Sequence, residues 1–216
     1  MQNRIIEFVI HGIVLLTAFP VHECAHALSA HWLGDDTAKE QGRISLNPLR
    51  HLDLFGTIFM LFAGFGWAKP VPINPNNFKN RKVGMAVSSL AGPLSNILMS
   101  YVSIIIFKIL TYSSGGNTYI DALADVFWYS TILNLGLAVF NLLPVPPLDG
   151  SRIFNLVLPE KIYFKIMKYE NIVFGILFLA IWIGFLDRPL LFLQQKAFDL
   201  MNLLSIWVDI LMIRGR

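Results

Sequence analysis

The residues best suited to chemistry lie close together near the start of the chain. His22, Glu23 and His26 occur within HECAH (22–26). Residues four apart on an α-helix share a face and are separated by about 6 Å along its axis, so two imidazoles can hold one metal ion. Histidines at this spacing with an adjacent glutamate are typical of zinc-binding helices in which the glutamate is the general base. The alternative is a pair of structural histidines satisfied by their neighbours.

The residues around this cluster are apolar. Residues 8–19 (FVIHGIVLLTAF) have no formal charge. Burying three ionisable side chains in a membrane helix costs several kcal/mol, and such residues usually mark a functional site. The context therefore favours a metal site over two structural histidines.

The composition indicates an integral membrane protein. Hydrophobic residues make up 55% of the chain and charged residues 14%, against about 25% charged in soluble domains. Residues 83–107 and 126–148 lack Asp, Glu, Lys and Arg, and each exceeds the roughly 20 residues that span a bilayer. The net charge of +3 comes from short basic loops, so we expect no nucleic-acid partner. A single cysteine, Cys24, excludes an internal disulfide.

We predict an all-α polytopic membrane protein with about 4–6 membrane helices in one domain over residues 1–216. Helices are expected at 5–33, 83–110, 122–143, 171–186 and 190–213. The last of these either spans the bilayer or lies at its surface. Between the first two helices, alternation in 42–46 predicts a short strand or β-hairpin, and 54–68 is short enough to be re-entrant.

The loop charges predict the orientation. Lys and Arg are concentrated in residues 67–82 and 144–170, whereas 111–121 contains neither. The positive-inside rule places both basic loops in the cytoplasm. We therefore expect a multi-pass protein of the cell membrane with its site toward the cytoplasmic side.

A catalytic zinc site needs a third protein ligand. His31 is turned away from the face of His22 and His26, and His11 lies about 16 Å along the helix, so both are expected to be packing or interfacial histidines. Asp149 is the better candidate, because it follows the proline-broken helix end in NLLPVPPLDG (141–150) and both helices descend to the same side. The alternative is an aspartate that caps a turn before Gly150.

Five segments occur in an order that resembles the site-2 protease family of intramembrane zinc metalloproteases. They are PVHECAHA (20–27), GRISLNP (42–48), GWAKPVPINPNNF (66–78), SLAGPLSN (89–96) and NLLPVPPLDGSRI (141–153). The resemblance implies that His22, His26 and Asp149 bind one Zn²⁺ per chain and that Glu23 is the general base. Asn141 matches an asparagine near the family's active site, where an amide could donate to the developing oxyanion.

Two further asparagines fall on the central helices. Asn96, with Pro93, matches the AGP-containing helix of the family, and Asn134 lies on the next helix. Both are expected to form hydrogen bonds between helices rather than to bind substrate. The chain has no room for the PDZ or CBS domains of other branches, so regulation would come from separate membrane proteins.

The expected function is a zinc-dependent endopeptidase that cleaves transmembrane segments of membrane proteins within the lipid bilayer. The alternatives are a membrane metal-binding or transport protein with the same ligands, and an inactive scaffold for membrane helices. Glu23 distinguishes them, because a hydrolase needs a carboxylate that does not bind the metal and a transporter does not. The substrate and the oligomeric state stay open.

Overall fold

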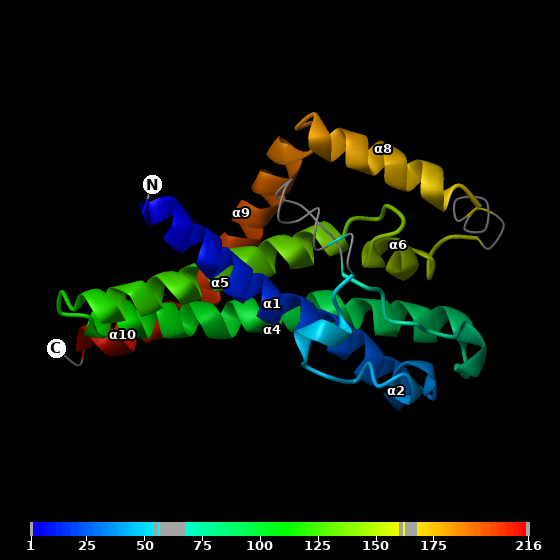
Figure 1. The fold of residues 1–216 in the computed structure, drawn as a ribbon, viewed down its shortest axis with the longest axis horizontal. Coiled ribbons are helices and arrows are strands. Elements are labelled where there is room, and N and C mark those ends of the chain that lie inside the picture. Colours follow the sequence, from blue (N-terminus) through cyan, green and yellow to red (C-terminus); the bar gives the residue numbers. More distant parts are fainter. Residues whose placement is uncertain (1, 54–55, 57–67, 160–161, 163–167, 215–216) are drawn as a thin grey trace. The chain divides into compact units, whose positions relative to one another are not determined.

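Helices make up most of the computed structural model, which describes residues 2–53, 56, 68–159, 162 and 168–214 (Figure 1). The long helices are α1 (Gln2–Trp32), α4 (Arg81–Ser113), α5 (Thr118–Asn141), α8 (Glu170–Trp182), α9 (Asp187–Leu204) and α10 (Ile206–Arg214). The short ones are α2 (Thr37–Glu40), α6 (Asp149–Phe154) and the 3₁₀ turns η1 (Pro48–Arg50) and η2 (Pro75–Asn77). The predicted re-entrant element at 54–68 lies almost entirely outside the described residues.

Among the described residues, three helices are long and apolar enough to cross a membrane. They are Gly12–Trp32 within α1, α4 and α5, and the bent pair α8 and α9, at 85°, makes a fourth if it counts as one span. The helical membrane class is thus confirmed, while the count of 4–6 membrane helices stays a prediction. Residues 42–46 carry no assigned strand, and in the described part of the chain pairing is limited to one antiparallel bridge between Leu52 and Ala68.

Prolines explain where one helix ends. α5 stops at Asn141, three residues before Pro144, because proline lacks the N–H that continues a helix. The predicted final helix at 190–213 is divided into α9 and α10 at Ser205, whose side chain is fully buried. An α-helix satisfies its own backbone N–H and C=O groups by internal hydrogen bonds, as the lipid interior requires, so helices are suited to the membrane spans.

The chain forms two compact units, each assembled from separate segments. The helical unit contains Met1–Ala18, Asn96–Phe140 and Ala180–Arg216. The site unit contains Phe19–Ser95 and Asn141–Leu179. The cluster predicted from the sequence belongs to the second of these.

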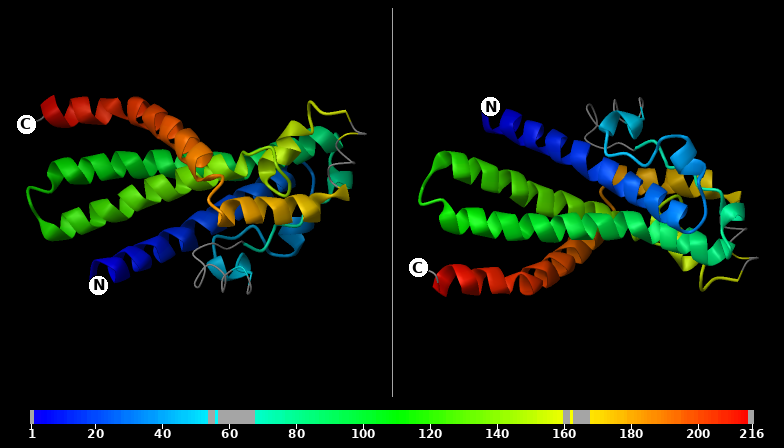
Figure 2. Two further views of the ribbon diagram at one scale, coloured as in Figure 1. Left: turned by 90° about the horizontal axis from the view of Figure 1, so that it is seen from above. Right: turned by 90° about the horizontal axis from the view of Figure 1, so that it is seen from below.

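In the helical unit, α4 and α5 run antiparallel (Figure 2). Polar side chains join the two helices. The Asn96 amide donates to the Asn134 amide oxygen at 2.8 Å, and both side chains are fully buried. The Ser100 hydroxyl donates to the carbonyl of Thr131 at 3.0 Å. These contacts confirm the predicted interhelical hydrogen bonds, and they satisfy polar groups that would be costly in hydrocarbon.

An ion pair joins the last helix to α4. Lys108 Nζ lies 2.6 Å from Asp209 Oδ2 on α10, and the Tyr112 hydroxyl donates to the other oxygen of that carboxylate. Charged residues in membrane helices are tolerated when they pair with one another. The C-terminal helix is therefore tied to α4 across about one hundred residues of sequence.

In the site unit, the end of α1 is connected to the chain that follows it. Asp35 is fully buried and accepts hydrogen bonds from Thr37, from the backbone of Asn74 and from the side chain of Asn77. Burial opposes the charge of Asp35, but these donors stabilise it and hold the pKa of the carboxyl below its usual value. Asp35 thereby fixes residues 74–77 against the helix that carries HECAH.

Candidate metal centre

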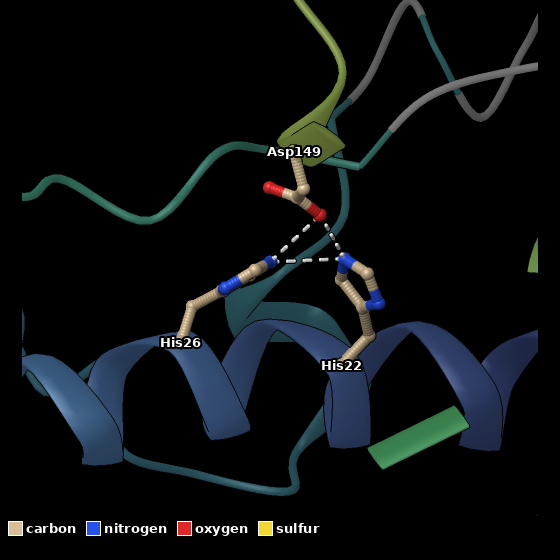
Figure 3. A group of neighbouring side chains, drawn as sticks. All are labelled: His22, His26 and Asp149. Atoms are coloured by element: carbon tan, nitrogen blue, oxygen red, sulfur yellow. Dashed lines mark hydrogen bonds and ion pairs between the residues drawn. The ribbon is translucent and has the colours of Figure 1, made fainter. Parts of the chain in front are cut away.

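The structure brings His22, His26 and Asp149 together (Figure 3). One carboxylate oxygen, Asp149 Oδ2, lies 3.2 Å from Nε2 of each histidine. The two Nε2 atoms are 3.0 Å apart, and the rings meet edge to face. Among the described residues this is the group of side chains that could hold a metal ion.

The spacing of these three atoms fits a zinc ion. The three atoms are close enough for one ion to contact all of them at the usual Zn–N and Zn–O lengths of about 2.0–2.1 Å. Two imidazoles and a carboxylate are ligands that zinc commonly takes, and three protein ligands would leave a fourth position for water or substrate. The two histidines are buried and Asp149 is partly buried.

α4 orients His26. Its Nδ1 lies 2.7 Å from the carbonyl oxygen of Ser88. Because a carbonyl only accepts, Nδ1 must donate, and Nε2 is then free to present its lone pair to a metal. One turn later, Gly92 of α4 faces the same rings: a β-carbon there would lie 2.3 Å from His26 Nε2.

Asp149 is placed by the first turn of α6. The following residue, Gly150, packs against the backbone after α5, where a β-carbon would lie 2.3 Å from the carbonyl oxygen of Leu142 and 2.4 Å from that of Leu143. Burial opposes ionisation of Asp149, but attraction to His26 and hydrogen bonds from His22 and His26 hold the pKa of its carboxyl well below its usual range. Asp149 is therefore an anionic ligand group at neutral pH.

Glu23 lies beside the cluster and is held from another segment. Its Oε2 accepts a hydrogen bond from the backbone N–H of Val71 at 3.2 Å. Two residues earlier, the carbonyl of Lys69 accepts from the Arg43 guanidinium at 2.5 Å. Arg43 is buried, and its Nε has no hydrogen-bond partner. The basic side chain thus supports the segment that contacts Glu23.

The remaining sequence candidates are His31, His11 and Asn141. His31 pairs with Asp36 on the surface, as expected for an interfacial histidine. The His11 side chain lies outside the described part of the structure. Asn141 is the last residue of α5, half-buried and eight residues before Asp149; its predicted role stays a prediction.

Sequence reasoning did not identify Ser88 and Gly92, the two residues of α4 that contact the histidine rings. The SLAGPLSN segment (89–96) is a motif in which Pro93 and Asn96 stand out, and the sequence does not single out the glycine before them. The signal that could have identified Gly92 is a small residue beside a proline in a helix that must approach another helix closely. Arg43 was likewise recognised only as part of GRISLNP.

The fold and the site define a class of protein: a helical membrane protein with a buried cluster of two histidines and one aspartate. Residues 103–183 match the model of peptidase family M50, a range that includes Asp149. A protein of Bacillus subtilis, YwhC, named as a candidate zinc metalloprotease, is 43% identical over 175 residues, or 78% of this chain and 79% of its own. The chain therefore belongs to peptidase family M50, the site-2 protease family.

More distant relatives carry similar names. A candidate zinc metalloprotease of Methanocaldococcus jannaschii is 30% identical over 153 residues, covering 70% of this chain and 72% of its own. Rip2 of Mycolicibacterium smegmatis, also named as a candidate zinc metalloprotease, is 26% identical over 144 residues, which covers 62% of this chain and 52% of that protein. No solved structure matches this chain.

Proposed function

We propose that the protein is a zinc-dependent endopeptidase that cleaves transmembrane segments of membrane proteins. The observation that carries the proposal is the convergence of His22, His26 and Asp149 beside Glu23. The names of the relatives support zinc and proteolysis. The ligand set holds one Zn²⁺, and residues 1–216 act as a single catalytic domain.

Each residue has a distinct part in this mechanism. His22, His26 and Asp149 would hold a zinc ion, which would act as a Lewis acid and activate a water molecule near neutral pH. Glu23 takes the proton of the attacking water and delivers it to the leaving amine. The Ser88 carbonyl keeps His26 in the tautomer that binds metal. The amide of Asn141 donates to the oxyanion that develops on the substrate carbonyl.

The substrate helix must unwind before it can be cut, because its peptide bonds are shielded by internal hydrogen bonds. We propose that the unwound strand pairs with residues 68–73 or 42–48. Support comes from Lys69, whose N–H donates to the carbonyl of His51, and from the bridge between Leu52 and Ala68. These contacts join residues 51–52 to residues 68–69, close to the Val71 N–H that holds Glu23. The Arg43 guanidinium, which donates to the carbonyl of Lys69, connects residues 42–48 to the same stretch.

The proposed setting is a cell membrane, with the catalytic site toward the cytoplasm. Both basic loops belong to the site unit, whereas the loop between α4 and α5 in the helical unit contains no Lys or Arg. The positive-inside rule then assigns the site unit to the cytoplasmic side. Partners are single-span membrane proteins and the lipid bilayer.

Replacing Glu23 by Gln tests the reaction. The amide cannot accept the proton, so we expect cleavage of a helical substrate in proteoliposomes to fall by at least about 10²–10⁴-fold. Zinc content should stay at the wild-type level, because the three ligands are intact. Normal cleavage by Glu23→Gln would sink the proposed mechanism.

The same preparation separates a protease from a transporter. Sealed vesicles are loaded with a zinc-sensitive dye, and external zinc is added. A protease gives no zinc entry above protein-free vesicles, while the substrate in the same bilayer is cut. Zinc entry without cleavage would favour transport.

A further inference from the structure

We infer that one turn of α4, from Ser88 to Gly92, positions the two histidines, and that Gly92 must lack a side chain for the metal to bind. The inference rests on the proposed zinc site. It concerns residues that carry no ligand group of their own, so they act through His22 and His26 as positioning residues.

The contact at Gly92 is with the ligating edge of the rings. A β-carbon at this position would lie 2.3 Å from His26 Nε2, 2.5 Å from His26 Cε1 and 2.7 Å from His22 Cε1. Non-bonded heavy atoms normally stay about 3.5–4.0 Å apart. A ligated zinc ion needs a place about 2.0–2.1 Å from Nε2. A methyl group at Gly92 would therefore crowd the atom that must bind the metal.

Ser88 restrains the same ring from its other nitrogen. Ser88 and Gly92 are four residues apart and share a face of α4. The Ser88 carbonyl accepts from His26 Nδ1 at 2.7 Å, while the Gly92 backbone lies against Nε2 and Cε1. The ring is thus fixed at one nitrogen by a hydrogen bond and confined at the other by close backbone packing. Moving α4 away to make room would lengthen the Ser88 hydrogen bond.

The test is Gly92→Ala in detergent-solubilised protein. We expect zinc affinity, measured by competition with a chromogenic chelator, to fall at least about 10-fold, as for loss of an outer-shell partner. The visible spectrum of Co²⁺-loaded protein should lose its tetrahedral bands. Gly84→Ala is the matched control. Gly84 lies on the same helix as Gly92, and a β-carbon there would lie 2.3 Å from the Phe78 ring, away from the histidines. Gly175→Ala, with nothing within 4 Å, is the neutral control.

A second background separates metal positioning from misfolding. With His22 and His26 both replaced by Ala, Gly92→Ala should leave the melting temperature unchanged, whereas Gly84→Ala should lower it in either background. If Gly92→Ala does not fold in the natural background but folds in the double-alanine background, the crowding of the rings is established. Equal destabilisation in both backgrounds overturns the inference.

The outcome is separable from that of the proposed function. If the natural protein binds no zinc, the proposed function fails. If it binds zinc and Gly92→Ala binds it with unchanged affinity and an unchanged Co²⁺ spectrum, the positioning inference fails while the zinc site stands.

Discussion

Asp149 closes the cluster at the scale of single residues. His22 and His26 come from one turn of α1, and their nitrogens meet a single oxygen that belongs to a segment 123 residues further along the chain. Without that oxygen the histidines form only half of a zinc site, since a catalytic site normally has three protein ligands.

Asp149→Ala should therefore weaken zinc binding more than loss of an outer-shell partner, which costs about 10–100-fold. Competition titration with a chelator measures the affinity. Asp36→Asn is the control, because its carboxylate pairs with His31 on the surface and not with the cluster. Zinc affinity of Asp149→Ala close to that of the natural protein would show that the third ligand lies elsewhere.

How far the site was predictable depends on how local each signal is. The pairing of His22 with His26 follows from helix periodicity, which the sequence displays within five residues. Asp149 needed the proline-broken helix end and a family resemblance, because nothing near His26 points to it. For Gly92 the sequence signal indicates only close helix packing, because the ring that the glycine faces lies 66 residues earlier in the chain.

At the scale of elements, residues 71–77 are hydrogen-bonded at two points to α1 and to the turn that comes after it. The Val71 N–H donates to Glu23, and Asn74 and Asn77 donate to Asp35. The side chain of Val71 also packs in a buried cluster with Ala27 and Ala38. The general base and the end of its helix are therefore held by the same loop.

Replacing Asp35 by Asn should destabilise the protein in a pH-dependent manner. The folded-state pKa of Asp35 lies below its unfolded value of about 3.9, so its stabilisation is complete above pH 4 and is lost as the pH falls through the folded pKa. At pH 7 we expect a loss of about 1–3 kcal/mol. Below pH 4 the natural protein and Asp35→Asn should converge.

Denaturant unfolding in detergent, at pH 7 and at several values below 4, measures this difference. The exposed Asp199 accepts a hydrogen bond from the Gln195 side chain one turn earlier on α9, and Asp199→Asn supplies the control. A stability difference that stays constant across the pH range would mean that Asp35 contributes by shape and not by charge.

Element prediction succeeded where the signal was an uninterrupted apolar run. The expected helices at 83–110 and 122–143 differ from α4 and α5 by a few residues, because charge-free length and Pro144 determine them. The structure of the loop between α1 and α4 is harder to predict from the sequence, because it depends on hydrogen bonds between side chains and backbone groups elsewhere in the chain. Three such side chains are Arg43, Asp35 and His51. Alternation in 42–46 suggested a strand, and no strand is assigned there.

At the scale of the whole molecule, the three proposed metal ligands and the buried polar contacts between α4 and α5 belong to different units. The site unit contains all three proposed ligands, and the helical unit contains the buried polar contacts of α4 and α5. Large apolar side chains are exposed on α4, α8, α9 and α10, among them Leu98, Ile176, Leu191 and Leu211. Such exposure suits a lipid environment and would be unusual in water.

Zinc removal should therefore loosen one unit selectively. In hydrogen-exchange mass spectrometry, chelation is expected to speed exchange in peptides covering 19–32 and 149–155, which the ion cross-links. Peptides covering 96–113 and 118–134 should exchange at the same rate with and without metal. Asp149→Ala, measured in parallel, should show no response to chelation. A uniform change along the chain would contradict a metal site confined to the site unit.

Gly150 has no functional group, yet the carbonyls of Leu142 and Leu143 occupy the space that any larger residue would need. In a saturation-mutagenesis screen scored by growth or cleavage, position 150 would consequently tolerate substitution as poorly as the neighbouring aspartate. Genetic essentiality at 149 and 150 would have two different origins: one residue contributes an anion, and the other contributes only the absence of a side chain. A variant at 150 with every proposed ligand intact could thus be as defective as one that has lost a ligand.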